Sequence, residues 1–276
     1  NPLRVSEDLQ VPIPPYLPDT AVAQRDVRQV YSNIVAMDEQ VGQVLEELEQ
    51  DGLLESTVIF WYSDHGGPLP RQKRLLYDAG LQVPMIIRYP DKWRAGELDD
   101  QLISFVDFKS TALSLAGIEP PEYVDGRAFA GKFQSSESRQ YIHAAADRFD
   151  RQYDTIRAVR DERFKYLRNY YPERGYYLPL TYREQMPIMQ ELLRLKEQNA
   201  LTEAQSQWFR ESKPSEELFD TLSDPHELTN LALDPAYSDK LLELRKELDR
   251  WLSGFDDMGM MPEPDLINEI WPGMEQ

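Results

Sequence analysis

A short loop concentrates the side chains of this 276-residue chain that could do chemistry together. Its sequence, SDHGGPLPRQKR, covers residues 63–74, and Lys73 follows Asp64 by nine residues. Asp64 offers a hard carboxylate oxygen, and His65 offers an imidazole nitrogen. A divalent cation beside a mobile ammonium group forms a receptor for a tetrahedral oxyanion. The residue types therefore indicate a metal-binding pair, Asp64 and His65, next to an anion-binding Lys73.

The two residues of this pair can converge only where the backbone leaves a regular strand. Adjacent side chains of a strand point to opposite faces of the sheet. Gly66 and Gly67 supply the break, because glycine takes positive φ without a steric penalty. Lys73 can then fold back over the same crevice. An alternative stays open at this point, in which Asp64 caps a turn, His65 is exposed and the basic residues form a solvated loop.

The elements around the loop predict an α/β fold with a largely parallel sheet. Residues 1–18 are proline-rich and extended, and a helical period of apolar residues predicts a helix over 20–51. β-Prone runs predict buried strands at 57–62 and 84–89, and a helix is expected at about 104–116. The loop therefore leaves the C-terminal end of a buried strand, where open α/β sheets place their ligand crevices.

After about residue 135 the pattern changes, and we expect the chain to divide there. Residues 1–135 are expected to belong to an α/β domain, and residues 136–276 to form a smaller α+β subdomain. A short strand at 141–146 and a hairpin over 155–170 predict an antiparallel sheet. A final helix at 236–252 is expected to lie on that sheet.

Composition excludes several classes of function. The chain has 30 Lys+Arg against 49 Asp+Glu, a net charge of −19, which argues against a nucleic-acid partner. No apolar stretch approaches the roughly 20 residues that a membrane span needs. The absence of cysteine excludes disulfides, thiolate metal sites and a cysteine nucleophile. The start at Asn1 is interpreted as an interior point of a longer sequence.

Short motifs recur in a fixed order along nearly the whole chain. They are YSNIVAMD at 31–38, TVIFWYSDHG at 57–66, YDAG at 77–80, and ELFD, DPHE and NLA between 217 and 232. In this combination they resemble the sulfatase family of the alkaline-phosphatase superfamily. Residues 11–20, the insertion at 67–70 and the C-terminal stretch are most similar to sulfamidase-like sulfatases.

The resemblance implies a fold and a site. The fold would be an alkaline-phosphatase-like sandwich with a mostly parallel central sheet. Asp64 and His65 would be one of two ligand pairs for a single Ca²⁺ or comparable divalent ion, with His65 between the metal and the nucleophile or sulfate oxygens. Lys73 would contact the sulfate and stabilise charge on it as the S–O or S–N bond breaks. Arg74 is a second candidate for that contact, because a one-residue shift in the loop would give it the role.

The sequence also departs from the family pattern. Sulfatases use a formylglycine nucleophile made in a Cys/Ser-x-Pro-x-Arg motif, which this sequence lacks, as it lacks the N-terminal metal-binding Asp pair. The simplest account is the C-terminal part of a longer sulfatase, inactive alone, that acts on a sulfated carbohydrate and is periplasmic or secreted. Two alternatives stay open: a phosphoesterase or phosphonate monoester hydrolase of the same superfamily, and a non-catalytic, truncated binding module.

A basic run in the second half has two interpretations. It either lines a subsite for an acidic sugar, with Arg148 the best candidate, or forms salt-bridged surfaces of a hairpin. His143 is interpreted as a packed strand residue and His226 as structural. Tyrosines at 170–171 and 176–177 either stack on sugar rings or form a contact between copies in a homo-oligomer. The basic residues are Arg148, Arg151, Arg157, Arg160, Arg163, Lys165, Arg168 and Arg174.

Overall fold

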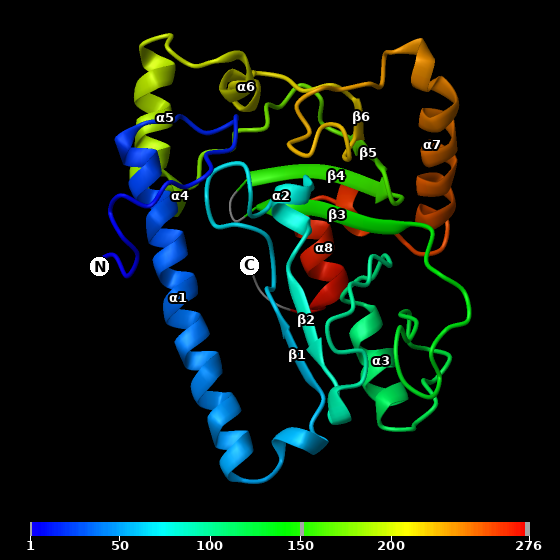
Figure 1. Cartoon of the computed structure of the whole chain (residues 1–276). Helices are drawn as coiled ribbons and strands as arrows, with labels where there is room; N and C mark the ends of the chain where they lie inside the picture. The colour runs from blue at the N-terminus through cyan, green and yellow to red at the C-terminus, as the bar shows by residue number, and fades with distance from the viewer. Residues whose placement is uncertain (1, 150–151, 274–276) are drawn as a thin grey trace.

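The computed structural model describes residues 2–149 and 152–273 of the chain (Figure 1). This part contains one β-sheet of two strands and one of four strands, with helices around them. The helices and strands follow in the order α1 (Ala21–Gln50), β1 (Ile59–Tyr62), α2 (Asp78–Leu81), β2 (Met85–Arg88), α3 (Asp107–Leu115), β3 (Ile142–Phe149), β4 (Gln152–Arg160), β5 (Phe164–Asn169), α4 (Thr181–Glu184), α5 (Pro187–Glu197), α6 (Glu203–Ser206), β6 (Glu216–Asp220), α7 (Ser238–Leu252) and α8 (Glu263–Ile270).

The long helix α1 confirms the first helix prediction but does not lie on a sheet. Thr20 caps it, because the Thr20 hydroxyl accepts a hydrogen bond from the backbone N–H of Ala23. The buried residues Ala23 and Val27 belong to the main core, which also contains residues of α5. The Asp26 carboxylate accepts a hydrogen bond of 2.8 Å from the backbone N–H of Ile188, the second residue of α5. The N-terminal turns of α1 are therefore fastened to α5.

The strands predicted at 57–62 and 84–89 exist as β1 and β2, but the mostly parallel sheet expected around them is wrong for the described residues. The two strands pair antiparallel, with Ile59 opposite Arg88. Neither strand is fully buried, and Ile86 is 61% exposed. Parallel strands need a crossover that returns to the opposite end of the sheet. Here the connection starts and ends at the same end, as Figure 1 shows.

The second sheet agrees with the sequence-based expectation. Its strands are all antiparallel and follow the order β3-β4-β5-β6. The predicted hairpin is the β4–β5 pair, in which Val159 lies opposite Tyr166. Helix α7 buries Leu241, Leu244 and Leu248 against these strands. Helix α7 thus packs on the small antiparallel sheet, as predicted, but it is not the final helix, because α8 follows it.

One core joins residues from both halves of the sequence. It contains Tyr16 and Leu17 of the extended lead-in, residues 75–77, and Ile188 of α5. Residues 75–77 end the connection between β1 and α2, residues 63–77, which is called the site loop below. The boundary expected at residue 135 stays a prediction. No helix within the described residues is both long enough and apolar enough to cross a membrane.

Candidate functional site

The site loop begins where β1 ends and exposes Asp64 beside His65. The Asp64 side chain is 85% exposed and the His65 side chain about one-third exposed, at 32%. The Ser63 hydroxyl donates a 2.7 Å hydrogen bond to the His65 carbonyl oxygen and fixes the first turn of the loop. Both candidate ligands are therefore open to a bound ion or ligand.

One hydrogen bond of the His65 ring indicates which of its nitrogens carries the proton. Nδ1 lies 2.8 Å from the Gly66 carbonyl oxygen. Because a carbonyl only accepts, Nδ1 carries the proton in the neutral ring, and Nε2 keeps its lone pair. That nitrogen lies 3.6 Å from Oδ2 of Asp64, too far for a hydrogen bond. Two lone-pair donors thus lie side by side with no hydrogen bond between them.

This spacing fits two neighbouring ligands of one divalent ion. Ligands about 2.4 Å from a Ca²⁺ ion and at about a right angle to each other lie roughly 3.4 Å apart. The Asp64–His65 pair alone is an incomplete shell, because Ca²⁺ takes about 6–8 ligands. The described residues contain no group of three or more His, Asp or Glu side chains that could hold a metal ion. The pair fits part of a metal shell and needs further ligands.

Backbone hydrogen bonds bring the two ends of the loop together. The N–H groups of Gly66 and Gly67 donate to the carbonyls of Gly80 and Ala79 at 2.9 and 3.1 Å, and Lys73 donates to Gly67 at 3.0 Å. A Cβ on Gly66 would lie 2.0 Å from the Ala79 carbonyl oxygen. Close backbone approach therefore requires this glycine.

The expectation that the glycine pair takes positive φ is wrong. Neither Gly66 nor Gly67 is among the described glycines with positive φ. The left-handed conformations of this loop instead fall on Arg71 and Arg74, at φ +63° and +77°.

The anion-binding role of Lys73 stays a prediction, and the structure shows how its backbone is held. Its backbone is tied to Gly67, next to the Asp64–His65 turn. Its side chain is half-buried, and its ammonium forms no hydrogen bond or ion pair with the described residues. Arg74 differs, because its Nε donates to the Tyr182 hydroxyl at 3.1 Å and its guanidinium lies over that ring.

The alternative in which the basic residues form a solvated loop is wrong for Arg71. The residue is only 4% exposed. Its Nη1 and Nη2 donate to the carbonyl oxygens of His226 and Glu227 at 2.9 and 2.8 Å. Its guanidinium also lies 4.8 Å from the ring centre of Tyr16 and 4.2 Å from that of Tyr77. No local sequence signal announces this, because its hydrogen-bond partners lie 155 and 156 residues away.

A buried ion network holds the far end of the loop, at α2. The Lys165 ammonium lies 2.5 Å from Asp78 and 2.7 Å from Glu227, and it donates to the Leu76 carbonyl. The other carboxylate oxygen of Glu227 accepts a bond from the Asp78 backbone N–H. Burial raises the pKa of the Glu227 carboxyl, and the Lys165 charge acts in the opposite direction. Sequence reasoning missed this network.

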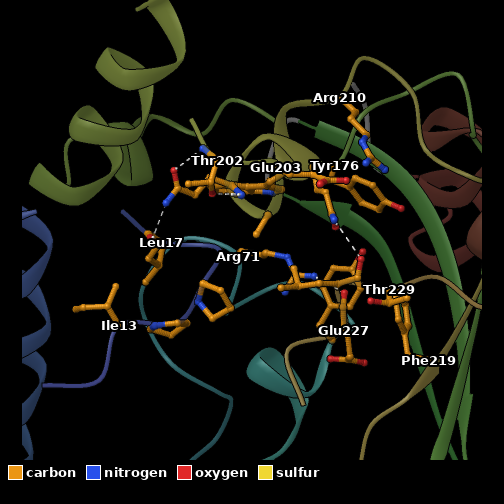
Figure 2. Close-up of a pocket in the computed structure, with 18 of the residues that line it drawn as sticks. Ile13, Leu17, Arg71, Tyr176, Thr202, Glu203, Arg210, Phe219, Glu227 and Thr229 are labelled. Atoms are coloured by element: carbon orange, nitrogen blue, oxygen red, sulfur yellow. Dashed lines mark hydrogen bonds between the residues drawn. The ribbon is translucent and has the colours of Figure 1, made fainter. Parts of the chain in front are cut away.

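A cavity of about 970 Å³ opens beside Arg71 (Figure 2). The proline-rich lead-in forms one wall, and the segment around α6 and the turn after β6 form others. At its lining, the buried Glu217 accepts hydrogen bonds from the Tyr77 hydroxyl and the Asn169 amide, at 3.0 and 2.7 Å. Burial raises the pKa of the Glu217 carboxyl and that of the neighbouring Tyr176 hydroxyl. No pattern in the sequence indicates this cavity.

Arg148, the proposed sugar contact, is held by the C-terminal segment. It donates to the Met261 carbonyl at 2.7 Å and forms an ion pair with Glu263. Arg157 and Lys165 are each 1% exposed, so the hypothesis of exposed hairpin charges is wrong for these two. Arg151 lies outside the described residues.

The remaining residues singled out by the sequence pack within the chain. His143 stacks on Trp251 at 4.8 Å and contacts Glu247, and burial lowers its pKa. Its interpretation as a packed strand residue agrees with this arrangement. Three of the four tyrosines pack against rings of this chain: Tyr176 against Tyr77, Tyr171 against Tyr153 and Tyr177 against Trp208.

Comparisons with known proteins place the chain in a family. The sulfatase family profile matches residues 8–118, and the profile of the C-terminal region of N-sulphoglucosamine sulphohydrolase matches residues 71–207. An ulvan-active sulfatase of Formosa agariphila is 61% identical over 99% of this chain and 46% of its own length. Human N-sulphoglucosamine sulphohydrolase is 26% identical over 89% of this chain and 51% of its own. The chain thus spans about half the length of these curated relatives.

A solved structure shows the same fold. It is that of a protein in complex with its substrate D-glucosamine-2-N,6-O-disulfate, and it matches with a TM-score of 0.65. The match covers 89% of this chain and 45% of that one, at 21% sequence identity. The antiparallel sheets described above are therefore part of a sulfatase-like fold. The chain belongs to the sulfatase family, with a C-terminal region of the N-sulphoglucosamine sulphohydrolase type.

Proposed function

We propose that this chain forms one half of a metal-dependent sulfatase that hydrolyses sulfate esters or sulfamates of a sulfated polysaccharide. The observation that carries the proposal is the Asp64–His65 pair, whose lone-pair donors lie 3.6 Å apart beside the backbone-tied Lys73. Family membership and the 61% identity to a protein named as an ulvan-active sulfatase support the reaction class and the polyanionic substrate.

Each site residue has a distinct proposed role. Asp64 and His65 hold part of a Ca²⁺ shell, and the ion, when bound, supplies Lewis-acid stabilisation of negative charge on the sulfuryl oxygens. The hydrogen bond from Nδ1 to the Gly66 carbonyl orients the imidazole so that Nε2 faces the ion. Lys73 donates to a sulfate oxygen and stabilises charge as the sulfur–oxygen or sulfur–nitrogen bond breaks.

Two further basic residues have weaker claims to the substrate. The Arg74 guanidinium is bonded to Tyr182, and that of Arg148 is paired with Glu263. Each guanidinium therefore already uses part of its donors within the chain. The formylglycine nucleophile is expected from the half of the relatives that this chain does not match.

A chimera tests the proposal directly. This chain replaces the matching 273-residue region of the ulvan-active sulfatase, to which it is 61% identical. Sulfate release from ulvan oligosaccharides is measured by ion chromatography, with phosphonate and phosphate monoesters as competing substrates. We expect sulfate release from the chimera and none from the 276-residue chain alone. Faster cleavage of a phosphonate monoester, or no sulfate release by a folded chimera, would reject the proposal.

A further inference from the structure

We propose that Arg71 is a positioning residue, which fixes the loop so that Lys73 stays beside the Asp64–His65 pair. The inference rests on the proposed function for its catalytic consequence. Arg71 itself is placed away from the reacting atoms, because both its hydrogen bonds end on main-chain carbonyls.

The environment of Arg71 suits an arginine and no other side chain. The guanidinium fork meets two successive carbonyl oxygens, at His226 and Glu227, while tyrosine rings lie within cation–π distance. A lysine keeps the charge but lacks the fork. A shorter side chain leaves both carbonyls without these donors.

Glu227 contacts both Arg71 and Asp78, the two residues that bound the second part of the loop. Its carbonyl oxygen accepts from Arg71, and its carboxylate accepts from the Asp78 N–H and pairs with Lys165. The segment from Arg71 to Asp78 is therefore held at both ends by the same turn. Lys73 lies inside this segment, and its N–H reaches back to Gly67. The contacts thus connect the buried turn at 226–227 to the metal pair.

The backbone of Arg71 shows that these contacts impose a conformation. Its φ of +63° lies in the left-handed region, which costs on the order of 1 kcal/mol for a residue with a Cβ. Such a conformation persists when surrounding contacts determine it. Loss of the guanidinium contacts removes that support, and the loop is then free to leave the arrangement that places Lys73.

The cavity makes the proposal testable by chemical rescue. Arg71 lines it, as Figure 2 shows, with its side chain running between the lead-in residue Leu17 and Glu227. Truncation to alanine opens a guanidinium-sized space on a cavity of about 970 Å³. Added guanidinium ion can enter this space and donate to the same two carbonyls.

The experiment measures hydrogen exchange of loop amides in the 276-residue chain. The probes are the N–H groups of Gly66, Gly67 and Lys73, whose hydrogen bonds close the loop. In Arg71→Ala we expect at least tenfold faster exchange at these amides, with β4 and β5 unchanged, and partial reversal by millimolar guanidinium. Arg157→Ala is the matched control, because Arg157 is equally buried but contacts Asp147 and Asp257.

Several outcomes would overturn the inference. One is wild-type exchange of the loop amides in Arg71→Ala, and another is equal acceleration in Arg157→Ala. If Arg71→Ala does not fold, Arg71→Lys replaces it, and wild-type loop exchange in that variant contradicts a role for the fork. In the chimera, Arg71→Ala should lower kcat by about 10-fold to 100-fold and change KM much less. Added guanidinium should restore part of the lost kcat. Accelerated loop exchange in a chimera without sulfatase activity would reject the proposed function alone.

Discussion

Arg71 and Lys73 are two residues apart in one loop, yet their charges have different uses. Arg71 is buried and bonded to main-chain carbonyls, whereas the Lys73 ammonium has no partner among the described residues. Sequence reasoning could name Lys73, because its type and spacing from Asp64 suit anion binding. It could not identify Arg71 as structural, since a basic residue between Pro70 and Gln72 in a loop with further basic residues is typical of a solvated segment.

Removal of the Lys73 ammonium should have a large effect on turnover. Lys73→Ala in the chimera is expected to lower kcat by roughly two orders of magnitude, the scale for loss of one preorganised transition-state donor. Lys73→Arg should restore part of the rate, because charge is kept while geometry changes. Steady-state sulfate release gives both values. A large loss in Arg74→Ala with near-normal Lys73→Ala would instead assign the role to Arg74.

Gly66 should tolerate no side chain. Gly66→Ala places a Cβ 2.0 Å from the Ala79 carbonyl oxygen, so the loop must shift, at a cost of about 2 kcal/mol or more. Gly42→Ala is the control, because nothing lies within 4 Å of that Cβ in α1 and alanine favours helix by about 1 kcal/mol. In urea unfolding, the midpoint concentration should fall for Gly66→Ala and rise for Gly42→Ala, each relative to wild type. Equal midpoints would contradict the close approach.

Element by element, the periodic segments were predictable and the pairing direction of β1 was not. The helix over 20–51 and the β4–β5 hairpin follow from local patterns of apolar and turn residues, and both exist. The run at 57–62 correctly predicted a strand. Its antiparallel partner β2 could not be predicted, because direction depends on the path of the connecting chain. The cavity beside Arg71 could not be predicted either, since its walls come from segments that are distant in the sequence.

The end of β6 should give the chain an acid-sensitive contact. Hydrogen bonds from Arg163 lower the pKa of Asp220 to about 2, below its ordinary value of 3.8. Because the unfolded state binds this proton more readily, the stability that the pair contributes is full above about pH 4 and is lost as pH falls toward 2.

Asp220→Asn tests this contribution. The variant should unfold at a lower temperature than wild type at pH 7, and the difference in Tm should shrink as pH approaches 2. Asp249→Asn is the control, because Asp249 pairs with Arg168 while its side chain is 61% exposed. It should change Tm little at any pH. A difference for Asp220→Asn that is constant with pH would exclude the proposed ion-pair contribution.

On the scale of the whole molecule, the proposed function makes the chain one part of a larger fold and of a larger site. It spans about half the length of its curated relatives. It would contribute the Asp64–His65 pair and Lys73. Within the described residues, no third acidic or histidine side chain joins the pair as a metal ligand. For the proposed function, this pair must complete a metal shell built from two halves of one enzyme.

The Ca²⁺ dependence of sulfate release tests this requirement most directly. The chimera, stripped with a chelator, is titrated with Ca²⁺ as wild type, Asp64→Ala and His65→Ala, with exposed Asp249→Ala as the matched control. We expect the Ca²⁺ concentration for half-maximal activity to rise at least tenfold in Asp64→Ala, by a smaller factor in His65→Ala, and not at all in the control. An unchanged Ca²⁺ midpoint in Asp64→Ala, at measurable activity, would contradict the account.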